Sequence, residues 1–176
     1  MSDFFAAPPL DDSIQPTKLG ITLLPELEFA FQSRVQVIPE IRTLGDIGGM
    51  GVRKMLTIVG GDFEGPRLRG KVLAGGGDWP LIRPDKVGIV DARYTLQTDD
   101  GVYINIVNTG FRHGPEEVIS HLESKQGVPD PAAYYLRTYT RFESPTGPYD
   151  WLNKHVFIGL GERHPKVLFL RYYLLK

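Results

Sequence analysis

Two alternating runs separated by an Asp-Gly turn constrain the fold of this chain more than any other feature. Residues 87–97 and 102–111 alternate apolar and polar side chains, and Thr98-Asp99-Asp100-Gly101 joins them. Successive side chains of a strand point to opposite faces, so this alternation is typical of half-buried strands. Asp-Gly between two such runs predicts a tight β-hairpin. The fold therefore has to be built around antiparallel strands.

The rest of the chain predicts more strands and one helix. Residues 115–126 place Val118, Ile119 and Leu122 on one helical face, and Gly127 follows the end of the segment. Further strands are predicted at 34–38, 55–59, 68–74, 134–143, 156–161 and 167–175, with 23–31 as either a short helix or the first strand. Many strands joined by turns favour a mainly β fold, an antiparallel sheet closed into a barrel. We expect one barrel domain over 21–176, preceded by an extended arm at 1–20 that carries three prolines.

The composition excludes several classes of protein. With 176 residues, of which 41% are hydrophobic and 23% charged, the chain suits one globular domain with a real core. A net charge of -1 provides no general basic surface for nucleic acid or an anionic membrane. The lack of cysteine excludes disulfides, thiolate metal ligands and a cysteine nucleophile. No secretion signal or bilayer-spanning run is visible, so we expect a cytoplasmic protein without nucleic-acid or membrane partners.

Two glycine-rich segments place an acid beside an aromatic residue and are the candidates for a functional site. They are Gly-Gly-Asp-Phe-Glu-Gly-Pro at 60–66 and Gly-Gly-Gly-Asp-Trp-Pro at 75–80, on either side of the predicted strand 68–74. Loops on a rigid scaffold commonly carry binding and catalytic residues. The same glycines also fit the bulges and tight turns of a β-protein, and the sequence leaves both interpretations open.

An acid–base pocket that needs no cofactor is the chemistry these residues favour. Asp78 would have a raised pKa if Trp79 and apolar neighbours exclude water from it, as a general base requires. Arg93 and Arg137 would stabilise an enolate or carboxylate that develops during proton transfer. We predict that these four side chains converge on one pocket at a barrel mouth. The predicted substrate-binding residues are Glu64, Asp91, Tyr94, Tyr135, Trp151 and, by stacking, Trp79.

Each of these assignments has a structural alternative. Asp78 also fits a turn cap, and Trp151 also fits a plug of the barrel end. The face of 134–142 that holds Tyr135 and Arg137 fits either solvent or a polar-lined barrel interior. No Gly-x-Ser-x-Gly elbow, phosphate loop or dinucleotide fingerprint is present, and the four histidines are scattered. We therefore expect no cofactor and no metal site.

Several short motifs, taken in order, resemble the domain-of-unknown-function family 3237. They are Gly-Gly-Asp-Phe-Glu-Gly-Pro (60–66), Gly-Gly-Asp-Trp (76–79), Asp-Ala-Arg-Tyr (91–94), Thr-Asp-Asp-Gly (98–101), Tyr-Leu-Arg-Thr (135–138), Tyr-Asp-Trp-Leu-Asn (149–153) and Val-Phe-Ile-Gly (156–159). Their order and spacing make the match specific over residues 20–176. The resemblance implies a small antiparallel β-barrel, calycin-like or allene-oxide-cyclase-like, that self-associates. Some fungal relatives are associated with isomerisation or cyclisation in natural-product pathways, although a fold does not fix a function.

Hypotheses from different classes follow. The first is a cofactor-independent isomerase, cyclase or lyase that acts by acid–base chemistry on a small, partly apolar carbonyl compound. The second is a barrel that binds such a compound as a carrier or sensor, and the third is a lactone hydrolase. An acid that the ligand can reach favours an enzyme, whereas arginines and aromatics without such an acid favour a carrier. The expected partners are a small organic molecule and, because both faces of 167–175 are apolar, a second copy in a homodimer.

Overall fold

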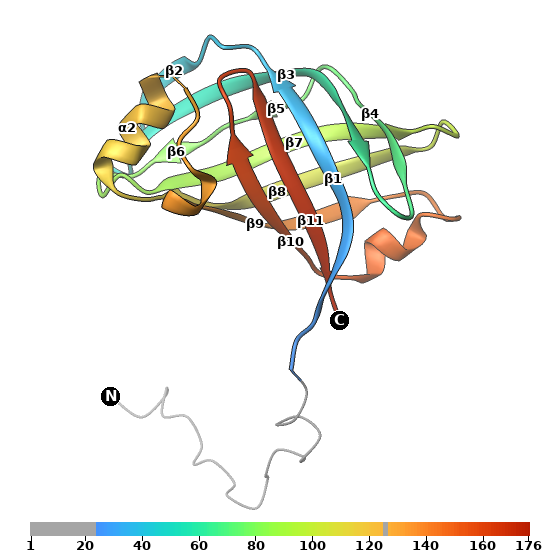
Figure 1. Cartoon of the computed structure of the whole chain (residues 1–176). Coiled ribbons are helices and arrows are strands. Elements are labelled where there is room, and N and C mark those ends of the chain that lie inside the picture. Colours follow the sequence, from blue (N-terminus) through green and yellow to red (C-terminus); the bar gives the residue numbers. More distant parts are fainter. Residues whose placement is uncertain (1–23, 125–126) are drawn as a thin grey trace, which may run out of the picture.

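The predicted hairpin forms part of the wall of a closed antiparallel barrel (Figure 1). The computed structural model describes residues 24–124 and 127–176. Strands β7 (Gly88–Thr98) and β8 (Tyr103–His113) pair along their length across the Asp-Gly turn. The other long strands are β1 (Leu27–Val37), β3 (Val52–Glu64), β9 (Tyr135–Glu143), β10 (Phe157–Arg163) and β11 (Val167–Leu175).

The barrel has eight positions around its circumference, and three short strands share one of them. The order is β1, β11, β10, β9, β8, β7, the shared position and β3, and β3 pairs with β1 to close the barrel. The short strands, which each pair with both β3 and β7, are β4 (Arg69–Val72), β5 (Gly77–Asp78) and β6 (Leu81–Ile82). Strand β2 (Arg42–Asp46) pairs with β3 outside this ring.

The mainly β fold and most of its strands confirm the sequence-based expectation. The ambiguous segment is a strand from Leu27 onward, and the helix α2 runs Glu116–Ser124. Residues 1–20 lie outside the described residues. Strands β2, β5 and β6 have no counterpart in the prediction, because two-residue strands and a glycine-containing edge strand carry no periodic signal.

The glycines at 60 and 61 lie inside β3, so the predicted loop at 60–66 is wrong over most of its length. Both have positive φ, 144° and 137°. A Cβ on Gly61 would collide with the carbonyl oxygen of Arg34, and the register with β1 shifts next to this point. The glycines thus provide a bulge at which β3 bends, and the bend lets one strand pair with β2, β5 and β6 near its start and with β1 and β4 near its end.

The two ends of the barrel are closed differently. At one end, a 3-10 helix, η2 (Asp150–Lys154), inserts Trp151 and Leu152 into the core. At the other end, α2 lies beside β2 and β6 (Figure 1), and its Leu122 packs with Tyr134 and Leu136. A second 3-10 helix, η1 (Pro131–Ala133), leads into β9.

The outer apolar residues of β11 are partly covered by side chains of neighbouring elements. The ring of Tyr173 packs edge-on against Phe29 of β1, with ring centroids 5.7 Å apart. The ring of Phe169 packs in the same way against His164, at 4.9 Å. Contacts within one chain therefore explain part of the apolar character on both faces of this strand, and the expected homodimer stays a prediction.

Candidate functional site

A cavity of about 290 Å³ lies inside the barrel at the α2 end. Its walls are mostly apolar side chains from β1, β3, β6, β7, β9 and β11. Enclosed, mainly apolar spaces with a few polar groups are typical of small-molecule sites. The polar and charged residues that line it are Thr43, Lys54, Asp78, Tyr94, Asn108, Arg112, Glu123, Thr138 and Arg163.

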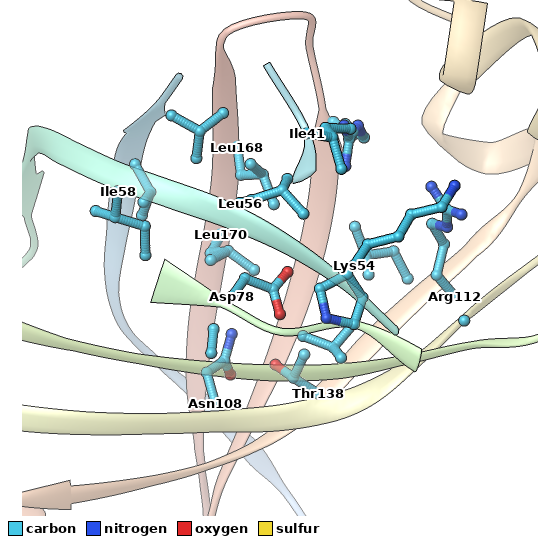
Figure 2. A pocket seen from close by; sticks show the side chains of 18 of the residues that line it. Ile41, Lys54, Leu56, Ile58, Asp78, Asn108, Arg112, Thr138, Leu168 and Leu170 are labelled. Carbon is cyan, nitrogen blue, oxygen red and sulfur yellow. The ribbon is translucent and has the colours of Figure 1, made fainter. Parts of the chain in front are cut away.

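Asp78 reaches this cavity because a short strand fits between two long ones. In β5, Asp78 pairs with Leu56 of β3 and with Ala92 of β7. A Cβ on Gly76 would collide with the side chain and backbone of Tyr94, so glycine is needed for this close approach. Figure 2 shows the Asp78 carboxyl group pointing into the pocket.

The Asp78 carboxyl group has the properties of a general base. Its Oδ1 accepts a hydrogen bond from the backbone N–H of Asp91 at 3.1 Å, and its Oδ2 has no hydrogen-bond partner among the described residues. Burial raises the pKa of Asp78 to about 6, although the Asp91 N–H and the positive charge of Arg163 act in the opposite direction. A carboxylate with a pKa near 6 is ionised at neutral pH and is more basic than an exposed aspartate, whose pKa is about 4.

Cationic side chains gather at one side of the cavity. Arg112 Nη2 lies 2.9 Å from Glu123 Oε1, and Lys54 Nζ lies 3.9 Å from Glu123 Oε2. Arg163 is the last residue of β10 and lines the same cavity. Burial and repulsion from Arg112 lower the pKa of Arg163, while Asp78 and Glu123 act in the opposite direction. Figure 2 shows Lys54 and Arg112 on one side of the pocket, away from Asn108.

Neutral hydrogen-bonding groups lie deeper in the barrel. Thr140 Oγ1 donates to Asn108 Oδ1 at 2.6 Å. The Asn108 amide N–H groups have no hydrogen-bond partner among the described residues and can therefore serve a ligand. The Tyr94 and Tyr172 hydroxyls form a buried hydrogen bond of 2.8 Å. Burial raises the pKa of Tyr94 to about 12, so its hydroxyl stays protonated at neutral pH. Tyr94 lines the cavity, whereas Tyr172 belongs to the aromatic core, so the pair lies at the boundary between the two.

Of the predicted site residues, the structure brings Asp78 and Tyr94 into the cavity and leaves the others outside it. Trp79 follows Asp78 in the chain, so its ring lies on the opposite face, over Gly77. The Arg93 side chain is 67% exposed and lies 3.8 Å from Asp91, whose side chain is 37% exposed. The predicted convergence of Asp78 with Trp79 and the two arginines is therefore not observed.

The remaining predicted residues are also distant from the cavity. Arg137 and Tyr135 lie on the outer face of β9, with the guanidinium 5.4 Å from the ring centroid. Glu64 is exposed and accepts a hydrogen bond from Gln32 at 3.1 Å. Trp151 packs at the other end of the barrel beneath Arg67. The polar face of residues 134–142 is thus a solvent face, one of the two alternatives that the sequence left open.

The sequence contains a signal for the two arginines that the prediction missed. On β8, Arg112 shares its parity with Ile104, Ile106 and Asn108, which are buried. On β10, Arg163 shares the face of Phe157, Gly159 and Gly161. Strand parity, extended past the predicted strand ends at residues 111 and 161, would have placed both arginines inside the barrel.

Comparison with known proteins now places the chain. A family model described as "Protein of unknown function (DUF3237)" matches residues 25–175. The chain belongs to this family. Relatives called UPF0311 proteins include one from Rhodopseudomonas palustris strain TIE-1, 40% identical over 127 residues, which are 72% of this chain and 82% of the relative. One from Clostridium acetobutylicum is 39% identical over 124 residues, 70% of this chain and 78% of the relative. The resemblance seen in the sequence motifs is thus confirmed.

Solved structures with this fold agree with the DUF3237 assignment. A Rhodopseudomonas palustris protein of unknown function has a TM-score of 0.84 and 32% identity, covering 88% of this chain and 100% of that one. A protein from Acinetobacter baumannii described as β-barrel like has a TM-score of 0.76 and 34% identity, covering 88% and 98%. A protein from Penicillium herquei described as an enzyme has a TM-score of 0.64 and 22% identity, covering 86% and 95%, and this likeness shows the fold alone.

The described residues contain neither a cluster suited to a metal ion nor a helix suited to a membrane. No group of three or more histidine, aspartate or glutamate side chains in that part of the chain is arranged to hold a metal ion. No helix among residues 24–124 and 127–176 is long and apolar enough to cross a membrane.

Proposed function

We propose that this DUF3237 protein is a cofactor-independent isomerase or cyclase that acts on a small, partly apolar carbonyl compound in the barrel cavity. One observation carries the proposal: a carboxylate with a raised pKa points into an apolar cavity of about 290 Å³ and keeps one oxygen free. A reachable acid in such a cavity supports an enzyme over a carrier, because a carrier gains nothing from burying a carboxylate.

The proposed reaction begins with proton transfer to Asp78. The free Oδ2 takes a proton from the carbon next to the substrate carbonyl, and the electron pair of that C–H bond moves toward the carbonyl oxygen to form an enolate. Asp78, now neutral, returns the proton to a different carbon in an isomerisation. In a cyclisation, the enolate carbon attacks a second carbonyl of the same substrate, the π bond of that carbonyl breaks, and Asp78 protonates the resulting alkoxide oxygen. No electron or atom is gained from outside, so the balance needs no co-reactant.

Asn108 supplies the hydrogen bond that the enolate oxygen requires. Its carbonyl is engaged by Thr140, which fixes the amide and leaves the N–H groups as donors toward the cavity. A donor fixed before the reaction stabilises charge that develops in the transition state, and loss of one such donor typically costs about 100-fold or more in rate.

Deuterium exchange tests this proposal even while the natural substrate is unidentified. A panel of small cyclic and aryl ketones is incubated with the protein in D₂O, and label at the carbon beside the carbonyl is followed by mass spectrometry. We expect accelerated exchange in at least one compound, reduced about 100-fold or more by Asp78→Asn. Asp62→Asn, which changes an outer carboxylate paired with Arg34, is the control and should leave the rate unchanged.

Three outcomes would contradict the proposal. Exchange at the normal rate in Asp78→Asn would remove Asp78 from the chemistry. Compounds that bind the wild-type cavity but show no exchange would instead favour the carrier or sensor. Release of an acid from a lactone, with loss of activity in Asp78→Asn, would favour the hydrolase, since Asp78 would then activate water.

A further inference from the structure

We infer that the ligand of this cavity carries a carboxylate and that Arg163, supported by Arg112, binds it. The inference deepens the proposed function because it assigns the charge of the substrate. Its evidence, however, comes from the cationic side of the cavity and is separate from the Asp78 chemistry.

Arg163 is a half-buried cation that has no ion-pair partner among the described residues. Its backbone N–H donates to the Tyr134 hydroxyl at 2.9 Å, but its guanidinium makes no hydrogen bond or ion pair with any of the described residues. A guanidinium cannot lose its proton in a protein, so it cannot avoid the cost of burial by neutralising. Buried charges are normally paired, and an unpaired one that lines a cavity indicates a ligand of opposite charge.

The neighbouring charges do not supply that partner. Glu123 is shared between Arg112 and Lys54. Asp78 is near enough to interact with Arg163 electrostatically, but the two form no ion pair within the described part of the chain. Three cations, Lys54, Arg112 and Arg163, therefore face two carboxylates, Glu123 and Asp78, and the cavity retains a net positive potential.

A carboxylate fits this arrangement better than a larger anion. The planar guanidinium fork matches the two oxygens of a carboxylate in a bidentate pair. A dianionic phosphate would bring a second negative charge close to both Glu123 and Asp78. The remaining walls are mostly apolar and the volume is about 290 Å³, so the rest of the ligand is a small, mostly hydrocarbon body. The inferred ligand class is thus a small keto acid or enolisable carboxylate.

Matched neutral and charged probes test the inference by binding alone. Titration calorimetry compares 3-phenylpropanoate with 3-phenylpropanamide, which has a similar shape and no charge, and with phenyl phosphate. We expect the wild-type protein to prefer the carboxylate by about tenfold or more, since a hydrogen bond to a charged group contributes about 1.5–3 kcal/mol. The preference should weaken as the salt concentration rises.

Variants assign the preference to Arg163. Arg163→Met keeps an apolar stem of similar length and should abolish the difference between carboxylate and amide. Arg171→Met, which removes an exposed cation from the outer face of β11, is the matched control and should retain it. If Arg163→Met does not fold, Arg163→Lys keeps the charge without the fork and should reduce the preference in part.

The outcomes separate this inference from the proposed function. Equal affinity for amide and carboxylate in the wild-type protein, or stronger binding of phenyl phosphate, would overturn the inference. A preference that survives in Arg163→Met would overturn the role of this residue. Asp78→Asn should retain or strengthen carboxylate binding, because it removes a like charge. If it does so while deuterium exchange is unaffected, only the proposed function fails.

Discussion

The two halves of the barrel interior differ sharply, although the same strands build both. The η2 end is filled by the rings of Phe31, Phe142, Phe157 and Tyr172, all of which are fully or almost fully buried. The α2 end is hollow and is lined by charged as well as apolar residues. Along β10, for example, the inward positions change from Phe157 to glycine and then to arginine.

This difference shows how a small barrel separates stability from function. The aromatic half buries large side chains and supplies most of the hydrophobic free energy. The hollow half is less tightly packed. It carries an arginine without an ion-pair partner among the described residues and a carboxylate whose ionisation is opposed by burial, and both cost stability. Functional sites are commonly places where a protein gives up local stability.

Truncation of a core ring should have the largest effect on stability. Phe157 is fully buried and contacts Phe142 at 4.9 Å between ring centroids and Trp151 at 5.8 Å. Phe157→Ala should lower the free energy of unfolding by about 3–5 kcal/mol, measured by urea denaturation. Leu168→Ala, in the wall of the existing cavity, should cost only about 1 kcal/mol, because its atoms are already partly unpacked.

An equal decrease in the free energy of unfolding in these two variants would contradict the difference between the halves. It would mean that the hollow half is packed in solution as tightly as the aromatic half. The difference between the halves would be supported if Leu168→Ala lowers the free energy of unfolding less than Phe157→Ala does. It would be supported further if only Leu168→Ala weakens binding of the cavity ligand.

Replacing Asp78 should have the next largest effect, and the effect should depend on pH. The pKa of Asp78 is raised from 3.8 to about 6 in the folded protein, so the folded state holds its proton more tightly than the unfolded state. Below about pH 4, the ionisation of Asp78 therefore does not lower the free energy of unfolding. Its cost grows as pH rises toward 6 and is complete above that value. At about 1.4 kcal/mol per pH unit between the two pKa values, the full cost is about 3 kcal/mol.

The measurement compares wild type with Asp78→Asn between pH 4 and pH 8. The amide introduced by this substitution keeps an oxygen that can accept the Asp91 N–H, so the fold should persist. The variant should equal the wild type near pH 4 and be more stable above pH 6 by up to about 3 kcal/mol. Asp62→Asn should show no such difference, since Asp62 is an outer residue in an ion pair. A stability difference between wild type and Asp78→Asn that does not change with pH would show that Asp78 is not desolvated.

The sequence predicts the barrel because local patterns define most of its strands. Alternation and an Asp-Gly turn define β7 and β8, and the bounds of β11 are predicted without error. The bend in β3 and the two-residue β5 and β6 are not predicted, because they depend on which strands lie beside them. A glycine pair reads equally well as a loop or as a bulge until its neighbours are known.

The site is predicted only in part, for a reason of geometry. The glycine-rich context identifies Asp78, and the structure places it in the cavity. Arg93 and Arg137 are candidates by residue type, but their parity directs them outward. Arg112 and Arg163 have inward parity but lie just beyond the predicted ends of their strands at residues 111 and 161, so the prediction did not include them. Charge type indicates the chemistry, whereas strand parity determines which charges reach a ligand.

The smallest effect is expected at the boundary between the two halves. Tyr94 and Tyr172 share a buried hydrogen bond of 2.8 Å, which closes the cavity floor against the aromatic core. Tyr94→Phe leaves the Tyr172 hydroxyl without this partner and should cost about 1–2 kcal/mol by urea denaturation. Because both hydroxyls are lost together in Tyr94→Phe combined with Tyr172→Phe, the double variant should be less destabilised than the sum of the singles. Additive losses would show that the pair is not coupled and that the floor is held by packing alone.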